Sequence, residues 1–305
     1  MISTEKLIKK RILVIGSNGM LGQRLSGYFL NKEKVELLCA SAEEESFIES
    51  VEYRQLDIRD KKQVKKIVRE FYPDFIINTA AYTNVDGCES NKELAWAVNV
   101  TGPENLAFYA HALDSHLIHI SSDYIFDGEN GPYTENDVPN PISYYGRTKL
   151  ASENVIKGSR CKFTIIRTNV LYGPAKFGRP DFVKWVVNSL RNNEVIRIVT
   201  DQINNPTYLD DLVFGIAKII ELKKEGIYNL AGKELLSRFE FTEKIADYFN
   251  LNHNLIKPIT TRELNQPAKR PLKSGLVILK AQTELNYKPH SLEETFRLMK
   301  KELNL

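Results

Sequence analysis

Three side chains near the middle of the chain have the types and spacing of a carbonyl-reducing site. Tyr145 and Lys149 are four positions apart, so on a helix they lie on one face. A phenol has a reference pKa of about 10, and a neighbouring ammonium favours the phenolate, which brings proton transfer nearer to neutral pH. The hydroxyl of Ser122 can hold a carbonyl oxygen against the phenol. Together these groups can protonate an alkoxide as a hydride arrives at carbon, and the chemistry requires no metal and no histidine.

A glycine-rich turn near the start of the chain indicates a dinucleotide site. It follows the β-branched apolar run 12–15 and precedes apolar residues at helical spacing, so it joins a strand to a helix. Its pattern, G-x-x-G-x-x-G, lets the backbone approach a pyrophosphate at the helix N-terminus. The alternative is an ordinary strand-to-helix turn that happens to contain glycines. The residues expected to hold the cofactor here are Gly16, Asn18, Gly19, Met20, Leu21 and Gly22.

The next strand, 35–39, bears on the choice of cofactor. It is followed by Ala40 and Ser41 without an immediate carboxylate, and Glu43 to Glu45 come slightly late. A carboxylate at this place binds ribose hydroxyls and repels a 2′-phosphate, whereas Ser41 could accept the phosphate. We therefore expect NADPH to be favoured, with NADH also used.

The segment 55–58 is expected to lie along the adenine ring. Asp57 could accept a hydrogen bond from the exocyclic amine, with Ile58 beside it. Asp57 could equally cap a helix over 61–70. The residues alone leave both roles open.

Composition describes an ordinary globular protein of one large or two modest domains. The chain has 305 residues, 42% hydrophobic and 27% charged, with a formal charge of +3 that is too small and dispersed to suggest nucleic acid or membrane binding. Three cysteines without metal or redox spacing suggest a reduced, cytoplasmic setting. We expect no signal peptide and no membrane span, and a polar, basic leader over residues 1–10.

Strands and helices alternate as far as about residue 170. The expected strands include 75–78, 117–120 and 163–167, and the expected helices include 94–111 and 144–157. This order predicts an α/β fold, a Rossmann-type doubly wound parallel sheet, whose ligands bind beyond the carboxyl ends of the strands.

The later chain is less regular. A helix at 181–191 and a short strand at 196–199 precede a helix at 209–222 and a strand at 227–230, which return to the sheet. We expect a cofactor-binding domain over 10–170 with 207–230 added. The smaller, mixed substrate domain is then formed by 171–206 and 231–305.

These segments resemble the extended short-chain dehydrogenase/reductases, and among them the dTDP-4-dehydrorhamnose reductases. The matching runs are 16–22, 78–86, 98–106, 122–128, 145–149, 201–202 and 206–207. The resemblance implies NADPH- or NADH-dependent reduction of the 4-keto group of a nucleotide-linked deoxysugar. It makes a nucleotide-diphosphate sugar the expected partner and leaves open whether the chain forms a homodimer.

The resemblance also assigns residues. Ser122, Tyr145 and Lys149 become the catalytic trio, and Asn99 matches an asparagine with a structural or proton-relay role, although capping or a turn explains it equally well. The further cofactor-binding residues that it implies are Ala80, Ala81, Tyr82 and Asn99. We also expect Thr83, Val85, Tyr124, Asn169 and Arg270 to bind the substrate, although Asn169 stands where the chain departs from the family pattern.

Two positions bear on the substrate. The rhamnose reductases usually carry Ser-Trp after the Arg-Thr pair at 167–168, where this chain has Asn169 and Val170. Loss of a stacking ring would change sugar selectivity but not the reaction type. Arg270 could clamp a diphosphate with its planar fork, or it could be a surface arginine before a proline turn.

Two other functions fit the same cofactor fold. One is a nucleotide-sugar epimerase or dehydratase, which would retain bound NAD. The other is a non-catalytic regulatory subunit of the methionine adenosyltransferase type, which would bind a synthetase and turn over no keto-sugar.

Overall fold

The computed structural model describes residues 9–303, so the expected leader lies almost entirely outside the described residues. Its centre is a seven-stranded sheet with the order β11-β6-β5-β4-β1-β2-β3, in which every neighbouring pair is parallel. The strands are β1 (Lys10–Ile15), β2 (Val35–Ser41), β3 (Glu52–Gln55), β4 (Phe75–Asn78), β5 (His116–Ser122), β6 (Lys162–Thr168) and β11 (Gly226–Asn229). The predicted doubly wound sheet is confirmed.

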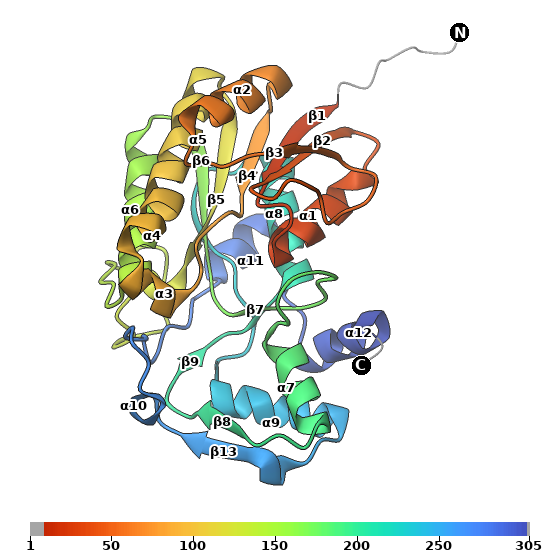
Figure 1. Ribbon diagram of the computed structural model, residues 1–305, viewed down its shortest axis with the longest axis vertical. Helices are drawn as coiled ribbons and strands as arrows, with labels where there is room; N and C mark the ends of the chain where they lie inside the picture. The colour runs from red at the N-terminus through yellow and green to blue at the C-terminus, as the bar shows by residue number, and fades with distance from the viewer. Residues whose placement is uncertain (1–8, 304–305) are drawn as a thin grey trace.

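Helices cover both faces of the sheet, because successive strand residues point to opposite sides. Ile12 and Val14 of β1 pack with one group of helices, and Leu13 and Ile15 pack with the other. The first group is α1 (Met20–Leu30), α8 (Leu209–Leu222) and α11 (Leu279–Leu285). The second is α2 (Lys61–Phe71), α5 (Gly102–Ala112) and α6 (Tyr144–Gly158), to the left of the sheet in Figure 1.

The single helix expected over 94–111 is interrupted. The chain forms α3 (Val85–Ser90) and α4 (Lys92–Trp96), then a π-helical turn (Ala97–Thr101) that leads into α5. Such turns occur inside helices where a side chain is given a special task. Here the turn contains Asn99, whose side chain forms hydrogen bonds with the backbone of Tyr82 in the loop before α3.

The lower part of the molecule in Figure 1 is built from short strands and helices. The strand pairs are β7 (Leu171–Tyr172) with β10 (Thr207–Tyr208), β8 (Ile196–Val199) with β13 (Ile256–Ile259), and β9 (Ile203–Asn204) with β12 (Leu236–Ser237). The helices are α7 (Phe182–Arg191), α9 (Arg238–Phe249), α10 (Thr261–Leu264) and α12 (Leu292–Leu303). Residues of α7, α9 and α12 form a separate apolar core. Most of these strands were not predicted, because two to four residues carry too little periodicity.

Within residues 9–303, no helix combines the length and the apolar character needed to cross a bilayer.

Candidate active site

The three candidate catalytic residues meet where β5 ends and α6 begins. Ser122 is the last residue of β5, and Tyr145 and Lys149 lie in the first two turns of α6. The helix can approach this strand end closely because position 146 is glycine: a Cβ on Gly146 would lie 2.1 Å from the carbonyl oxygen of Tyr124. Ser122 and Lys149 are buried, whereas Tyr145 keeps some exposure. The structure therefore brings the predicted trio together.

A buried polar network fixes Lys149. Its Nζ donates to the carbonyl oxygen of Ile120 at 2.7 Å, with the His119 ring 3.4 Å away. The side-chain amide of Asn78 donates to Nδ1 of His119 at 3.1 Å, so the ring proton is assigned to Nε2, which lies 3.0 Å from Oγ of Ser152. Because Nε2 carries the proton, it cannot accept from the Lys149 ammonium, and His119 contributes through Ser152, whose Oγ donates to the carbonyl oxygen of Lys149 at 2.6 Å. The spacing of residues in the sequence did not reveal this link.

Burial shifts the acidity of both catalytic groups. It raises the pKa of Tyr145 well above that of an ordinary phenol, and the polar Ser122 side chain nearby offsets only part of this rise. Burial also lowers the pKa of Lys149 to about 8, against the opposing charge of Glu153. The Lys149 ammonium donates to a backbone carbonyl in this structure, and its expected effect on the acidity of the phenol stays a prediction. A protonated phenol can still donate a proton to an alkoxide.

The glycine-rich turn forms a tight backbone cradle. Gly16 has φ +77°, and a Cβ there would lie 2.6 Å from the amide nitrogen of Ala80. A Cβ on Gly22 would lie 2.1 Å from the carbonyl oxygen of Gly16, so α1 packs directly on the turn. The helix begins after Gly19 with no side-chain cap and no acidic residue in its first turn. Free amide donors at a positive helix end are suited to a pyrophosphate, and these residues therefore fit a dinucleotide.

A carboxylate lies beside this cradle, contrary to what the sequence suggested. The amide of Asn18 donates to Oε2 of Glu43 at 3.2 Å. The Ser41 hydroxyl lowers the pKa of the Glu43 carboxyl and burial raises it, and the hydroxyl has the larger effect, so this pKa lies below its usual value. Asn18 also accepts from the backbone N–H of Phe47 at 2.9 Å and donates to the carbonyl oxygen of Glu45 at 2.9 Å. The loop after β2 is thereby folded back on the turn, and Glu43 is carried to the end of the strand.

Asp57 is not the cap of α2. Asp60 is, since its side chain accepts from the backbone N–H groups at the start of that helix. Asp57 instead pairs with Arg59 at 2.6 Å and follows β3 at the carboxyl edge of the sheet. Ile58 packs against Gly102, where a Cβ would lie 2.4 Å from its side chain. The capping alternative is therefore wrong, and the proposed adenine contact stays a prediction.

Asn99 has a structural role. Its carbonyl oxygen accepts from the N–H of Tyr82 at 2.7 Å, and its amide donates to the carbonyl oxygen of Tyr82 at 3.1 Å and to Oγ1 of Thr148 at 3.0 Å. These bonds tie the loop containing Ala81 and Tyr82 to α6. The side chain is buried and both of its ends are engaged, so direct contact with a cofactor is not supported.

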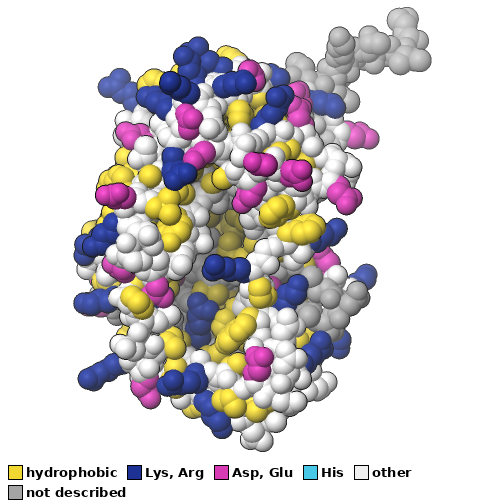
Figure 2. Space-filling view, in the orientation of Figure 1, with side chains coloured by type: hydrophobic (Ala, Val, Ile, Leu, Met, Phe, Trp, Pro, Cys, Tyr) yellow, Lys and Arg dark blue, Asp and Glu magenta, His cyan; other side chains and the backbone are white. Residues whose placement is uncertain are grey.

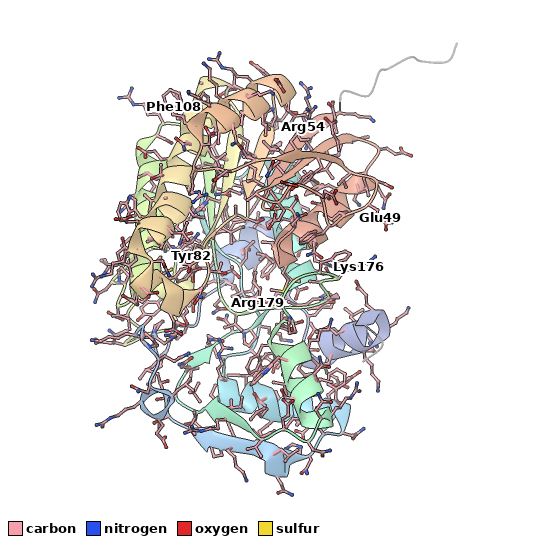
Figure 3. The ribbon with its side chains drawn as sticks, in the orientation of Figure 1. Glu49, Arg54, Tyr82, Phe108, Lys176 and Arg179 are labelled. Atoms are coloured by element: carbon pink, nitrogen blue, oxygen red, sulfur yellow. The ribbon has the colours of Figure 1, made fainter. Side chains whose placement is uncertain are left out.

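A cavity of about 330 Å³ lies between α3, the turn after β5 and the lower part of the molecule; Ser122, Tyr145 and Lys149 do not line it directly. Figure 2 shows a hollow in this region with Lys and Arg side chains inside it, and Figure 3 labels Tyr82 and Arg179 near it. The ring of Tyr124 faces that of Tyr145 with centroids 5.5 Å apart. The predicted residues that line the cavity are Val85, Tyr124 and Arg270.

Three arginines line this cavity, and two of them, Arg238 and Arg270, differ in their pairing. Arg270 is held by Asp86, with Nη2 2.7 Å from Oδ2 and a second bond from Nη1. Arg238 lies over the Phe182 ring at 5.0 Å, and among residues 9–303 its guanidinium has no ion pair.

Arg197, which is exposed, also lines the cavity without an ion pair among the described residues, so Arg238 is the less exposed of the two unpaired cavity arginines. The charge of Asp123 acts on Arg238 without forming an ion pair. Arg238 was not predicted, because the local pattern around it, a Ser237/Glu240 capping box, indicates only the start of α9.

Two expected substrate contacts are not brought to the cavity. Asn169 donates to Oδ1 of Asn205 at 2.8 Å and accepts from Thr207 at 3.1 Å, deep in the protein. Both ends of its amide are satisfied, so its role is to join β6 to the segment before β10. Thr83 is exposed and does not line the cavity. The assignment of Asn169 as a sugar contact is corrected accordingly.

No cluster of three or more His, Cys, Asp or Glu side chains suited to a metal ion occurs in the described part of the chain.

Comparisons with known proteins agree with this geometry. A family profile described as the RmlD substrate binding domain matches residues 10–305. A dTDP-4-dehydrorhamnose reductase of Aggregatibacter actinomycetemcomitans is 32% identical over 299 residues, covering 94% of this chain and 97% of that protein. The crystal structure of a dTDP-4-dehydrorhamnose reductase from Bacillus anthracis in complex with NADP has a TM-score of 0.86 at 34% identity and covers 96% of this chain and 99% of its own. Methionine adenosyltransferase 2 subunit beta of Xenopus tropicalis is 32% identical over 257 residues, 82% of this chain and 75% of that protein.

Proposed function

Because this chain belongs to the dTDP-4-dehydrorhamnose reductase family, we propose that it is an oxidoreductase that reduces the 4-keto group of a nucleotide-linked deoxysugar with NADH or NADPH. The proposed reaction converts dTDP-4-dehydro-L-rhamnose to dTDP-L-rhamnose. One observation carries the proposal: Tyr145 lies with Ser122 and Lys149 at the junction of β5 and α6, and its ring packs against Tyr124, which lines a cavity that also holds the guanidinium of Arg238.

Each catalytic side chain has a distinct task in this reaction. When bound, the reduced nicotinamide supplies the hydride. Tyr145 donates its phenolic proton to the oxygen that becomes negative as the carbonyl is reduced. Ser122 orients that oxygen toward the phenol. Lys149 uses one N–H on the carbonyl of Ile120, so its remaining protons are available to ribose hydroxyls.

The two arginines divide the work of binding the diphosphate. Arg238 offers a guanidinium that forms no ion pair among the described residues, and its planar fork suits phosphate oxygens. Arg270 is already engaged by Asp86, which fixes its position and removes most of its net charge. We therefore assign the larger part of diphosphate affinity to Arg238, and a positioning contribution to Arg270.

The position of Glu43 bears on the cofactor. A carboxylate at the end of β2 can bind the two ribose hydroxyls and repels a 2′-phosphate. Since Glu43 is held there by Ser41 and Asn18, we propose that NADH is used at least as well as NADPH. This revises the expectation of an NADPH preference, which depended on the absence of such a carboxylate.

The similarity to methionine adenosyltransferase 2 subunit beta supports a second candidate, a regulatory subunit without turnover. The two functions are separated by assaying a panel of nucleotide-linked 4-keto-sugars with both cofactors, alongside a test for association with a methionine adenosyltransferase. Turnover supports the reductase. Association without turnover of any keto-sugar supports the regulatory subunit. Whether the chain is a homodimer stays a prediction.

A further inference from the structure

Asp123 is a buried carboxyl whose two oxygens are held by two different hydroxyls. It directly follows Ser122 and is 2% exposed. Oγ of Ser122 lies 3.0 Å from its Oδ1, and Oγ of Ser274 lies 2.5 Å from its Oδ2. Ser274, also 2% exposed, comes from the late segment of the chain, 151 positions away. The carboxyl therefore links the catalytic strand end to the lower part of the molecule.

The backbone fixes Ser274 in place on both sides. Its N–H donates to the carbonyl oxygen of Ile203 at 3.0 Å, and the N–H of Lys273 donates to the carbonyl oxygen of Gly128 at 3.0 Å. The Ser274 hydroxyl donates its one proton to Oδ2 of Asp123. A proton taken up by Asp123 is therefore favoured on Oδ1, the oxygen that faces Ser122.

This arrangement gives Ser122 two states. A hydroxyl has a single proton to donate. While Asp123 is ionised, Ser122 donates that proton to Oδ1 and cannot donate to a substrate carbonyl. Once Oδ1 carries a proton, the carboxylic acid donates to Oγ of Ser122, and the hydroxyl proton of Ser122 is released toward the keto oxygen. The backbone N–H of Tyr124, 3.1 Å from the same Oγ, uses an acceptor site in either state.

We propose that Asp123 is a positioning residue that sets the direction of the Ser122 hydrogen bond, and that Ser274 decides which carboxyl oxygen carries the proton. This inference rests on the proposed reductase function, since it assigns Ser122 a donor role toward a keto oxygen. It names two residues that act through Ser122 without touching the reacting atoms.

The surroundings place this switch in an accessible pH range. Burial raises the pKa of Asp123 to about 6, while Ser274, Ser122 and the charge of Arg238 from α9 oppose the rise. Tyr145 from α6 and Tyr124 from the same turn also face the carboxyl, and both are raised in pKa, so they are neutral near pH 7. Arg238 is the charged group that faces Asp123, and it keeps its charge throughout this range.

The test is the pH dependence of kcat and KM for Ser274→Ala, Ser274→Thr and Asp123→Asn with dTDP-4-dehydro-L-rhamnose. Wild-type kcat should decline as the pH rises through the Asp123 pKa. Ser274→Ala removes a donor to the carboxylate, so the midpoint should move upward by about one pH unit. Ser274→Thr keeps the hydroxyl and should restore the wild-type midpoint. In Asp123→Asn the uncharged amide replaces the neutral carboxylic acid and does not titrate. The decline of kcat with rising pH should therefore disappear in this variant.

Two results would overturn the inference. The first is a Ser274→Ala enzyme with lower activity at every pH and an unchanged midpoint, because that describes a structural role only. The second is an Asp123→Asn enzyme that keeps the wild-type decline, and this comparison holds even if Ser274→Ala fails to fold. A carboxyl ¹³C NMR titration, with Asp123→Asn to assign the resonance, measures the same shift without turnover. If the wild type reduces no keto-sugar, the proposed reductase function is contradicted. This result differs from a failure of the Asp123 inference, because the NMR titration measures the Asp123 pKa shift without turnover.

Discussion

Arg270 and Asp86 form a two-point ion pair at the edge of the cavity, although 184 positions separate them in the chain. The Arg270 side chain is only 8% exposed, whereas that of Asp86 is 34% exposed, so the pair is buried on the arginine side and open to solvent on the carboxylate side. Arg238, on the other side of the same cavity, has no such partner among residues 9–303. The two arginines therefore differ in the positive charge that each presents to a ligand, because only that of Arg270 is offset by a paired carboxylate.

This difference predicts unequal effects of removing them. Arg238→Ala should raise KM for the nucleotide-sugar by about 10–100-fold, as expected for loss of a charge-assisted hydrogen bond, and leave NADH affinity unchanged. Arg270→Ala should also lower stability, because it leaves Asp86 without its partner. Arg191→Ala, on the exposed end of α7, is the control. Equal KM values for Arg238→Ala and the wild type would contradict the assignment.

Tyr145→Phe removes the phenolic proton and keeps the ring. We expect kcat to fall by ~10²–10⁴-fold, with cofactor affinity nearly unchanged, because the alkoxide loses its proton donor. Tyr144→Phe, at the adjacent position of the helix, should change kcat little. Steady-state kinetics and cofactor titration measure both. Activity of Tyr145→Phe within a few-fold of the wild type would remove Tyr145 from the mechanism.

Lys149 predicts an alkaline limb in the pH profile. Its ammonium has a pKa of about 8, so the cationic form is lost as the pH rises through that value and nucleotide binding should weaken. Lys149→Met should bind cofactor less tightly, turn over more slowly and lack this limb. Lys157→Met, farther along α6, should keep it. A profile of Lys149→Met that superimposes on that of the wild type would exclude the electrostatic role.

The same pKa shift predicts how Lys149 affects stability. The folded-state pKa is depressed from 10.5 to about 8, so between these values the unfolded chain binds more protons. Stability attributable to this residue therefore rises with pH across that window and is lowest below pH 8. Denaturation experiments on the wild type and Lys149→Met measure the free energy of unfolding of each. The excess stability of the variant over the wild type should become smaller as the pH rises toward 10.

Features formed by residues close together in the chain could be predicted from the sequence, whereas features formed by residues far apart in the chain could not. The glycine turn, β5 and α6 were predicted correctly, because each follows from local spacing and lies on a regular element. Glu43 was noted only as coming late after β2, and Arg238 was not predicted, since a folded-back loop and a distant helix determine where these two side chains lie. Asn169 was misassigned because a motif cannot reveal that Asn205 and Thr207 satisfy its amide. The division into two domains stays a prediction.

Glu43 provides a test of cofactor choice. Glu43→Gln removes the negative charge at the end of β2 while keeping a similar shape. The ratio of kcat/KM for NADPH to that for NADH should rise by about tenfold, equivalent to about 1.4 kcal/mol, because a 2′-phosphate is no longer repelled. Glu44→Gln, an exposed neighbour, should leave the ratio as in the wild type. An unchanged ratio in Glu43→Gln would show that this carboxylate does not select the cofactor.

The central claim is that this chain reduces a nucleotide-linked 4-keto-sugar, and one assay addresses it directly. Purified wild type and Tyr145→Phe are incubated with dTDP-4-dehydro-L-rhamnose and NADH or NADPH, and both cofactor oxidation and the sugar product are measured. We predict that the wild type forms dTDP-L-rhamnose in equal amount to the cofactor oxidised, and that Tyr145→Phe forms it at least ~10²-fold more slowly. Absence of cofactor oxidation with this substrate and every other nucleotide-linked 4-keto-sugar would contradict the claim.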